Sequence, residues 1–162
     1  ISKKFNGQLS SAVSEPELLN AFSNEQYAIA DYYENREFGK AIKSIMALAD
    51  QANQYIADKA PWVLAKQEGS EQQVQDICST GLNMFRMLMI YLKPILPIMT
   101  QDAARFLNDN LAWSGLNTPL VGHSIEKFKP LMTRIEGIQI EAMLEDSKVE
   151  VAKELALKEK QG

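Results

Sequence analysis

The sequence has few of the residues that build catalytic and metal centres. Its 162 residues contain one histidine and one cysteine, so neither an intrachain disulfide nor a cysteine or histidine metal cluster can form. The glycines are isolated, and none has the spacing of a phosphate-binding loop. The acidic residues are scattered along polar faces without forming an acid–base pair in an apolar setting. We therefore expect this chain to hold no catalytic or metal-binding residue and to catalyse nothing by itself.

Long hydrophobic runs are also lacking. The longest, "MFRMLMIYL", is short and is interrupted by Arg86, which excludes a membrane span. The N-terminus "ISKKFNG" lacks the apolar core of a signal peptide. The lone Cys78 lies on an apolar stripe, where a thiol behaves as a small hydrophobe, and low cysteine usage fits a reducing compartment. We expect a cytoplasmic protein without a membrane partner.

Positive charge is in slight deficit. The net charge of the chain is −4. After residue 135 there are seven acidic residues and four lysines, so residues 1–135 carry a net charge of only about −1. This balance predicts a local nucleic-acid contact rather than a broad phosphate-binding surface, and no DNA partner. Seven basic residues could gather at one end of the molecule: Lys3, Lys4, Arg36, Lys40, Lys43, Lys59 and Lys66.

Apolar residues that recur three and four positions apart predict helices. Ser14, Pro16 and Glu17 suggest a capping box, Ser70 with Gln73 a second helix cap, and Thr100 a third. No stretch alternates as a strand would. The predicted fold is all-α, an antiparallel bundle of about five helices. The expected helices cover about 16–35 (with a break at Ser23–Asn24), 37–59, 70–92, 100–107 and 137 onward, with a long connection over 108–130.

The helix over residues 70–92 is apolar almost all round, which is typical of a central, buried helix. We expect the bundle to span residues 1–150 and a polar helical tail or linker to span residues 151–162. The start "ISKK" has no methionine or helix cap, and the end is a polar tail. We interpret the chain as a fragment of a longer protein, with Phe5 and Leu9 exposed on an apolar groove.

A proline–tryptophan step ends the helix over residues 37–59. Pro61 cannot continue that helix and should push Ala60 toward extended dihedrals. Trp62 would then sit at a rigid corner beside Lys59, with Lys66 one turn further on. An aromatic ring held in this way can stack on an unpaired base. The alternative is that Trp62 fills the core where two helices meet, and the residues alone leave both interpretations open.

Three dispersed segments resemble one known family. They are "ENREFGKAIKSIMALADQANQYIADKAPWVLAKQE", "MFRMLMIYLKPILPIMTQDAARFLN" and "VGHSIEKFKPLMTRIE", and they closely resemble, in order, the C-terminal helical domain of bacterial methionyl-tRNA synthetase. The resemblance implies a bundle of the class I synthetase type that reads the CAU anticodon loop of tRNA(Met). It also implies a parent enzyme that attaches methionine to this tRNA using ATP, in a catalytic domain that this chain lacks.

The resemblance carries over to two residues. The family's anticodon-contacting pair matches Pro61 and Trp62, with Trp62 implied to meet chiefly the cytosine. Family Asn and Arg side chains that help to read the base belong to a helix that would precede Ile1. No cofactor is expected in this chain, whereas the parent would use ATP and magnesium, with zinc in the catalytic half as an option. The expected partners are the tRNA(Met) anticodon loop and the catalytic domain of the same parent chain.

Two alternatives compete with this interpretation. One is the equivalent domain of another class I aminoacyl-tRNA synthetase. The other is a helical protein–protein interaction module, in which Trp62 is a core or interface residue. Binding of a CAU stem–loop and the exposure of Trp62 separate these possibilities.

Overall fold

The computed structural model describes residues 1, 3–131, 137–145, 147 and 148. The chain divides into two compact units, Ile1–Leu131 and Met132–Gly162, and each is described here by itself. This division falls earlier in the chain than the predicted one at residue 150, and the predicted tail over 151–162 lies outside the described residues. Among those that are described, no helix is long and apolar enough to cross a membrane.

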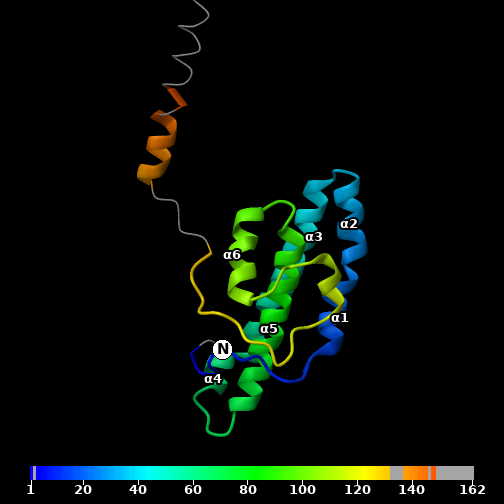
Figure 1. Ribbon diagram of the computed structural model, residues 1–162, viewed down its shortest axis with the longest axis vertical. Coiled ribbons are helices and arrows are strands. Elements are labelled where there is room, and N and C mark those ends of the chain that lie inside the picture. Colours follow the sequence, from blue (N-terminus) through cyan, green and yellow to red (C-terminus); the bar gives the residue numbers. More distant parts are fainter. Residues whose placement is uncertain (2, 132–136, 146, 149–162) are drawn as a thin grey trace, which may run out of the picture. The chain divides into compact units, whose positions relative to one another are not determined.

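The first unit is a bundle of helices joined by short turns and one long connection (Figure 1). The only β pairing in its described residues is an isolated bridge between Gln8 and Ser124. The predicted all-α antiparallel bundle is therefore confirmed. The elements are α1 (Pro16–Asn24), α2 (Gln26–Glu34), α3 (Phe38–Lys59), α4 (Pro61–Leu64), α5 (Glu71–Leu92), α6 (Pro97–Leu107) and the 3₁₀ helix η1 (Trp113–Asn117).

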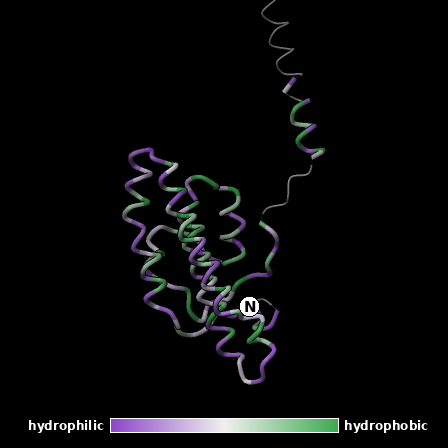
Figure 2. The backbone as a smooth tube through the Cα atoms, turned by 180° about the vertical axis from the view of Figure 1, so that it is seen from behind, coloured by the Kyte–Doolittle hydropathy of each residue, from purple (hydrophilic) through white to green (hydrophobic). Residues whose placement is uncertain are grey.

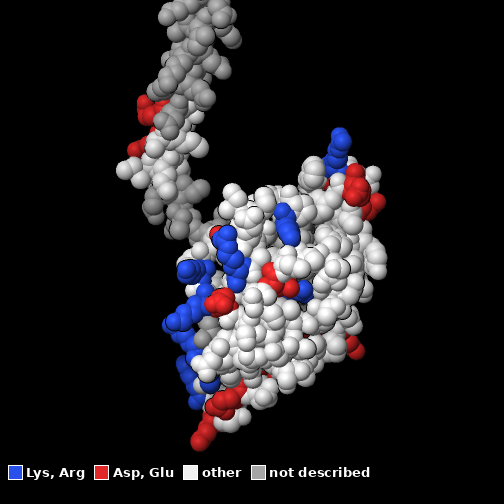
Figure 3. All heavy atoms as spheres, in the orientation of Figure 1, with Lys and Arg blue, Asp and Glu red and all other residues white. Residues whose placement is uncertain are grey.

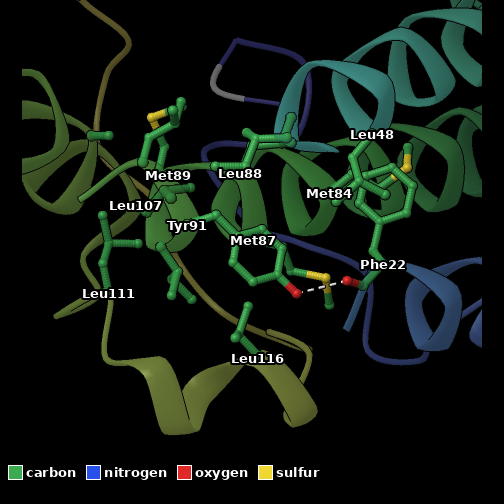
Figure 4. Close-up of a cluster of buried hydrophobic side chains, with 14 of the residues drawn as sticks. Phe22, Leu48, Met84, Met87, Leu88, Met89, Tyr91, Leu107, Leu111 and Leu116 are labelled. Atoms are coloured by element: carbon green, nitrogen blue, oxygen red, sulfur yellow. Dashed lines mark hydrogen bonds between the residues drawn. The ribbon is translucent and has the colours of Figure 1, made fainter. Parts of the chain in front are cut away.

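Helix α5 is the centre of the bundle, as its apolar sequence predicts. It packs against α1, α3, α4, α6 and η1, and its second half is buried almost without interruption. Met84, Met87 and Tyr91 are at most 1% exposed. The Tyr91 hydroxyl donates a hydrogen bond to the Phe22 carbonyl oxygen over 2.7 Å, which ties α5 to α1 inside the core (Figure 4).

The remaining helices are amphipathic, with hydrophilic and hydrophobic residues alternating along them (Figure 2). Helix α3 contacts α5 closely because Gly81 has no side chain. A Cβ atom built there would lie 2.8 Å from Cδ1 of Ile56. The predicted break in the first helix is confirmed at Glu25, between α1 and α2.

Three expected caps are wrong because the hydroxyl groups find other partners. The residue before α1 is Glu15, and Ser14 instead shares a hydrogen bond with the Thr80 hydroxyl over 3.1 Å. Ser70 precedes α5, but its hydroxyl turns back to the Gln67 carbonyl over 2.8 Å. Thr100 lies inside α6, where its hydroxyl bonds the Leu96 carbonyl of the preceding turn over 3.0 Å. Local sequence signals of this kind compete with long-range partners.

The N-terminal segment pairs with the end of the long connection. The Leu9 amide donates to the His123 carbonyl over 2.9 Å, and the Ile125 amide donates to the Gly7 carbonyl over 2.9 Å. Gly7 has a φ of +79°, and a Cβ there would meet the Ile125 carbonyl oxygen at 2.5 Å, so the pairing requires glycine. Leu9 is only 2% exposed. The expectation that Leu9 lies on an open groove is therefore wrong.

The connection after α6 is anchored by one buried arginine. Arg86 on α5 pairs with Asp109 over 2.9 Å, with side chains 5% and 14% exposed. It also donates to the Gly115 and Thr118 carbonyls over 2.7 and 3.1 Å. Burial alone would raise the pKa of Asp109, but hydrogen bonds from Arg86 and the Leu111 amide outweigh it and lower the pKa. Gly115 leaves room for the guanidinium, because a Cβ atom would collide with Arg86.

In the second unit, residues 137–145, 147 and 148 are helical, which agrees with the helix predicted from Gly137. Lys148 and Glu145 form an i,i+3 ion pair over 2.8 Å. Ile138, Met143 and Leu144 are exposed.

Candidate nucleic-acid interface

The corner between α3 and α5 is formed by a left-handed residue followed by proline. Ala60 has φ 41° and ψ 58°, so the prediction of extended dihedrals there is wrong. Its amide still donates to the Ile56 carbonyl over 3.0 Å, which closes α3 with a left-handed cap. Pro61 then begins the single turn α4, a position where the missing amide hydrogen costs nothing.

This geometry separates the two residues of the proline–tryptophan step. Pro61 is buried, whereas Trp62 is 57% exposed and Val63 is 48% exposed. Trp62 is therefore not a core residue, and the alternative in which it fills the helix junction is wrong. The proline fixes the backbone and the tryptophan presents much of its surface to solvent.

The cations around this corner differ from the expected set. Lys59 pairs with Glu15 over 2.9 Å and lies 5.6 Å from the centre of the Tyr55 ring. The hydrogen bond to Glu15 raises the pKa of Lys59. Lys59 is thus held on the side of α1 and α3, while Lys66 is exposed and forms no ion pair with any described residue.

The seven basic residues singled out in the sequence do not gather at one end. Helix α3 has 22 residues and is therefore about 30 Å long. Arg36, Lys40 and Lys43 lie at its start, and Lys59 lies at its end. Figure 3 shows instead that Lys and Arg side chains collect along the edge formed by the N-terminal segment and the connection after η1.

A small cavity of about 300 Å³ lies behind the corner. Pro61, Ile56, Cys78 and Phe106 are among its lining residues, so it is largely apolar. Burial raises the pKa of the Cys78 thiol, which keeps it neutral, as expected for a small hydrophobe. His123 contacts the Leu107 carbonyl oxygen through Nε2 at 2.7 Å, which is an ordinary hydrogen bond.

A larger cleft contains residues that the sequence analysis missed. It has a volume of about 530 Å³, and its walls include Arg105, Phe106, Lys127 and Lys129. Between the two lysines lies Phe128, which is 58% exposed. The signal was available as the tripeptide "KFK", an aromatic residue between two cations. In the part of the chain that the structure describes, no cluster of histidine, cysteine and acidic residues could hold a metal ion.

The described bundle is all-α, with an exposed tryptophan at an anchored corner and a cleft lined by basic residues, features that suit a binding domain. A family model described as the anticodon binding domain of methionyl tRNA ligase matches residues 7–144. The chain belongs to this family of anticodon-binding domains.

The fold also resembles solved structures of Mycobacterium tuberculosis methionyl-tRNA synthetase. The free-state structure has a TM-score of 0.73 at 15% identity, and the match covers 83% of this chain and 29% of that one. The complex with methionyl-adenylate gives 0.72 at 15% identity, with coverage of 82% and 28%. The chain thus spans less than a third of the length of these proteins. At this identity, the likeness establishes the fold.

Proposed function

We propose that this domain binds the CAU anticodon loop of tRNA(Met) at the Pro61–Trp62 step, where Trp62 contacts the RNA and Pro61 holds Trp62 in place. The observation that carries the proposal is the combination of a buried Pro61 with a Trp62 that is 57% exposed. Stacking an unpaired base on an aromatic side chain contributes about 1–3 kcal/mol and tolerates any base. Choice of the cytosine needs hydrogen bonds to its Watson–Crick edge.

The parent protein that we propose is a methionine–tRNA ligase. Membership of the family supports this, and the catalytic step would take place in a separate domain of the parent. That domain would use ATP and magnesium, and in some members of the family it would also bind zinc. Its setting would be the cytoplasm, and its partners would be this helical bundle and tRNA(Met).

The proposal is tested by fluorescence anisotropy with a labelled CAU stem–loop, a GAU stem–loop and a fully paired duplex. We expect the stem–loops to bind more tightly than the duplex, because stacking on Trp62 requires unpaired bases. Trp62→Ala should weaken stem–loop binding by tenfold or more, while Trp62→Phe should keep part of it. The matched control is Tyr27→Ala, which removes an aromatic side chain that is 74% exposed on α2 and should leave binding unchanged.

The two RNA loops report on different contacts. A preference for CAU over GAU measures base-specific hydrogen bonds, whereas the drop on Trp62→Ala measures stacking. Equal stem–loop binding by the unmutated chain and the folded Trp62→Ala variant would contradict the role proposed for Trp62. It would favour the alternative in which this corner contacts another protein.

A further inference from the structure

Phe128 is an exposed aromatic ring with a fixed support. It is 58% exposed, and its ring meets that of Phe106 edge-on, with centroids 5.4 Å apart at 79°. Phe106 in turn contacts Phe85 of α5, with centroids 6.4 Å apart. The backbone next to it is also held, because the Glu126 amide donates to the Phe106 carbonyl over 2.8 Å. A ring that is held through α6 and still exposed is a platform for stacking.

The two lysines beside Phe128 are available for an anionic ligand. Lys127 and Lys129 are exposed and form no ion pair with any described residue. Some other cations of the bundle form ion pairs, such as Lys59 with Glu15 over 2.9 Å and Arg105 with Asp102 over 2.6 Å. The cleft beside them also contains Asp102 and Glu126. Arg105 pairs with Asp102 and Glu126 offsets one lysine, so the three cations and two acids of the cleft leave a net charge of +1.

This cleft and the tryptophan corner are linked through Phe106. Phe106 lines the basic cleft and also the apolar cavity behind the corner. Pro61 lines that same cavity, and Trp62 follows it directly. The cleft beside Phe128 and the cavity behind the tryptophan corner therefore share one wall residue, Phe106.

We propose that Lys127, Phe128 and Lys129 form a second RNA contact, which stacks an unpaired base of the bound RNA and binds its neighbouring phosphates. An aromatic residue between cations suits single-stranded nucleic acid because every base has a π-face and every linkage a phosphate. Stacking and phosphate contacts carry no sequence information, so this contact should add affinity without sequence preference. The proposal rests on the proposed function in one respect, namely that the ligand is RNA.

The experiment measures binding of the CAU and GAU stem–loops by anisotropy at several salt concentrations. The Lys127→Gln/Lys129→Gln double variant should weaken both loops equally and reduce the slope of log K against log salt by about 1.4, which corresponds to two single-strand phosphate contacts. The matched control is Lys40→Gln/Lys43→Gln, at the start of α3, which should leave the slope unchanged.

Phe128 is tested with a pair of variants. Phe128→Leu keeps an apolar contact with Phe106 but removes the π-face, and it should weaken both loops about tenfold. Phe128→Tyr restores the ring and should restore binding. Circular dichroism and the melting temperature show that each variant is folded.

The outcomes separate this inference from the proposed function. If Trp62→Ala abolishes loop binding while the lysine and Phe128 variants bind normally, the second contact is overturned and the anticodon role stands. If Trp62→Ala is silent while these variants weaken binding, the anticodon role fails and the RNA contact stands. Competition by a poly-glutamate peptide as strong as by unlabelled RNA would overturn the assignment to nucleic acid.

Discussion

The two tryptophans of this chain occupy opposite environments. Trp113 opens η1 and packs edge-on against Tyr91, with ring centroids 5.4 Å apart at 69°, so it belongs to the partly buried border of the core. Trp62, by contrast, is 57% exposed to solvent. Each lies in a short helical segment next to α5. The two residues are of the same type, so residue type does not decide how exposed each one is. The exposure depends on how each helical segment is anchored to the bundle.

The anchors of the two segments differ in chemistry. The connection around Trp113 is held by Arg86, whose guanidinium donates hydrogen bonds to Asp109 and to two backbone carbonyl groups. The corner around Trp62 is held by the apolar side chain of Pro61. A polar anchor in the interior fixes a single arrangement, since each unpaired group would be costly. An apolar anchor at a corner leaves the next side chain free for a ligand.

The largest effect should come from removing the polar anchor. Arg86→Ala leaves the half-buried Asp109 without its ion-pair partner and two carbonyl groups without donors, and should lower the free energy of unfolding by about 3 kcal/mol. Urea denaturation followed by circular dichroism measures it. The control is Arg105→Ala, which breaks an exposed pair with Asp102 and should cost at most about 1 kcal/mol. A small loss for Arg86→Ala would show that the connection does not depend on this residue.

The next effect concerns Trp113 itself. Trp113→Ala removes the contact with Tyr91 and should lower the free energy of unfolding by about 2–3 kcal/mol, less than the roughly 3–5 kcal/mol expected for a fully buried tryptophan. Thermal unfolding measures this loss. A melting temperature equal to that of the unmutated chain would place Trp113 with Trp62 on the surface and remove the contrast between them.

Acid should weaken the polar anchor in a defined direction. The pKa of Asp109 is lower in the folded chain than its ordinary value, so the unfolded chain binds this proton more readily. The stabilisation is fully present above about pH 4, the unfolded value, and is lost as the pH falls through the lower folded value. Urea midpoints between pH 2 and 6 should show this loss in the unmutated chain. The Asp109→Asn variant should already be less stable at neutral pH, and its stability should lack the pH dependence that comes from residue 109.

The smallest effect on stability is expected at the other tryptophan. Trp62→Ala should change the free energy of unfolding by no more than about 0.5 kcal/mol, because an exposed side chain has little packing to lose. The same variant should lose most of its stem–loop binding. Both are measured on one preparation, by urea denaturation and anisotropy. A loss of several kcal/mol would instead mean that the corner is part of the core.

The sequence alone predicted the helices well where periodicity is long. Helices α3 and α5 begin and end within about one residue of the expected positions, because apolar stripes of six turns leave little freedom in register. The burial of α5 followed from its apolar residues on all sides. Pro61 marked the end of α3 because proline cannot continue a helix. The helix caps were less predictable, since Ser14 and Thr80 come from separate parts of the chain and pair only in the folded bundle.

The candidate site was predictable only in part. Pro61 and Trp62 were identified from the sequence, and their role stays a prediction until RNA binding is measured. The expected cation beside them, Lys59, is instead engaged by Glu15, which lies 44 positions away. Lys127, Phe128 and Lys129 were missed although the tripeptide places an aromatic residue between two cations, because only the fold shows that Phe128 is exposed and packs against Phe106. Phe106, which links the two cavities, makes that connection only after folding.

The amino-acid sequence by itself determined the all-α class, the central helix and the corner at Pro61, because these depend on local dihedral limits and on apolar periodicity. The tertiary structure decided which tryptophan is exposed, which lysines form ion pairs and which distant segments of the chain pack together. These properties depend on contacts between residues far apart in the chain, whose energies arise only when the bundle has formed.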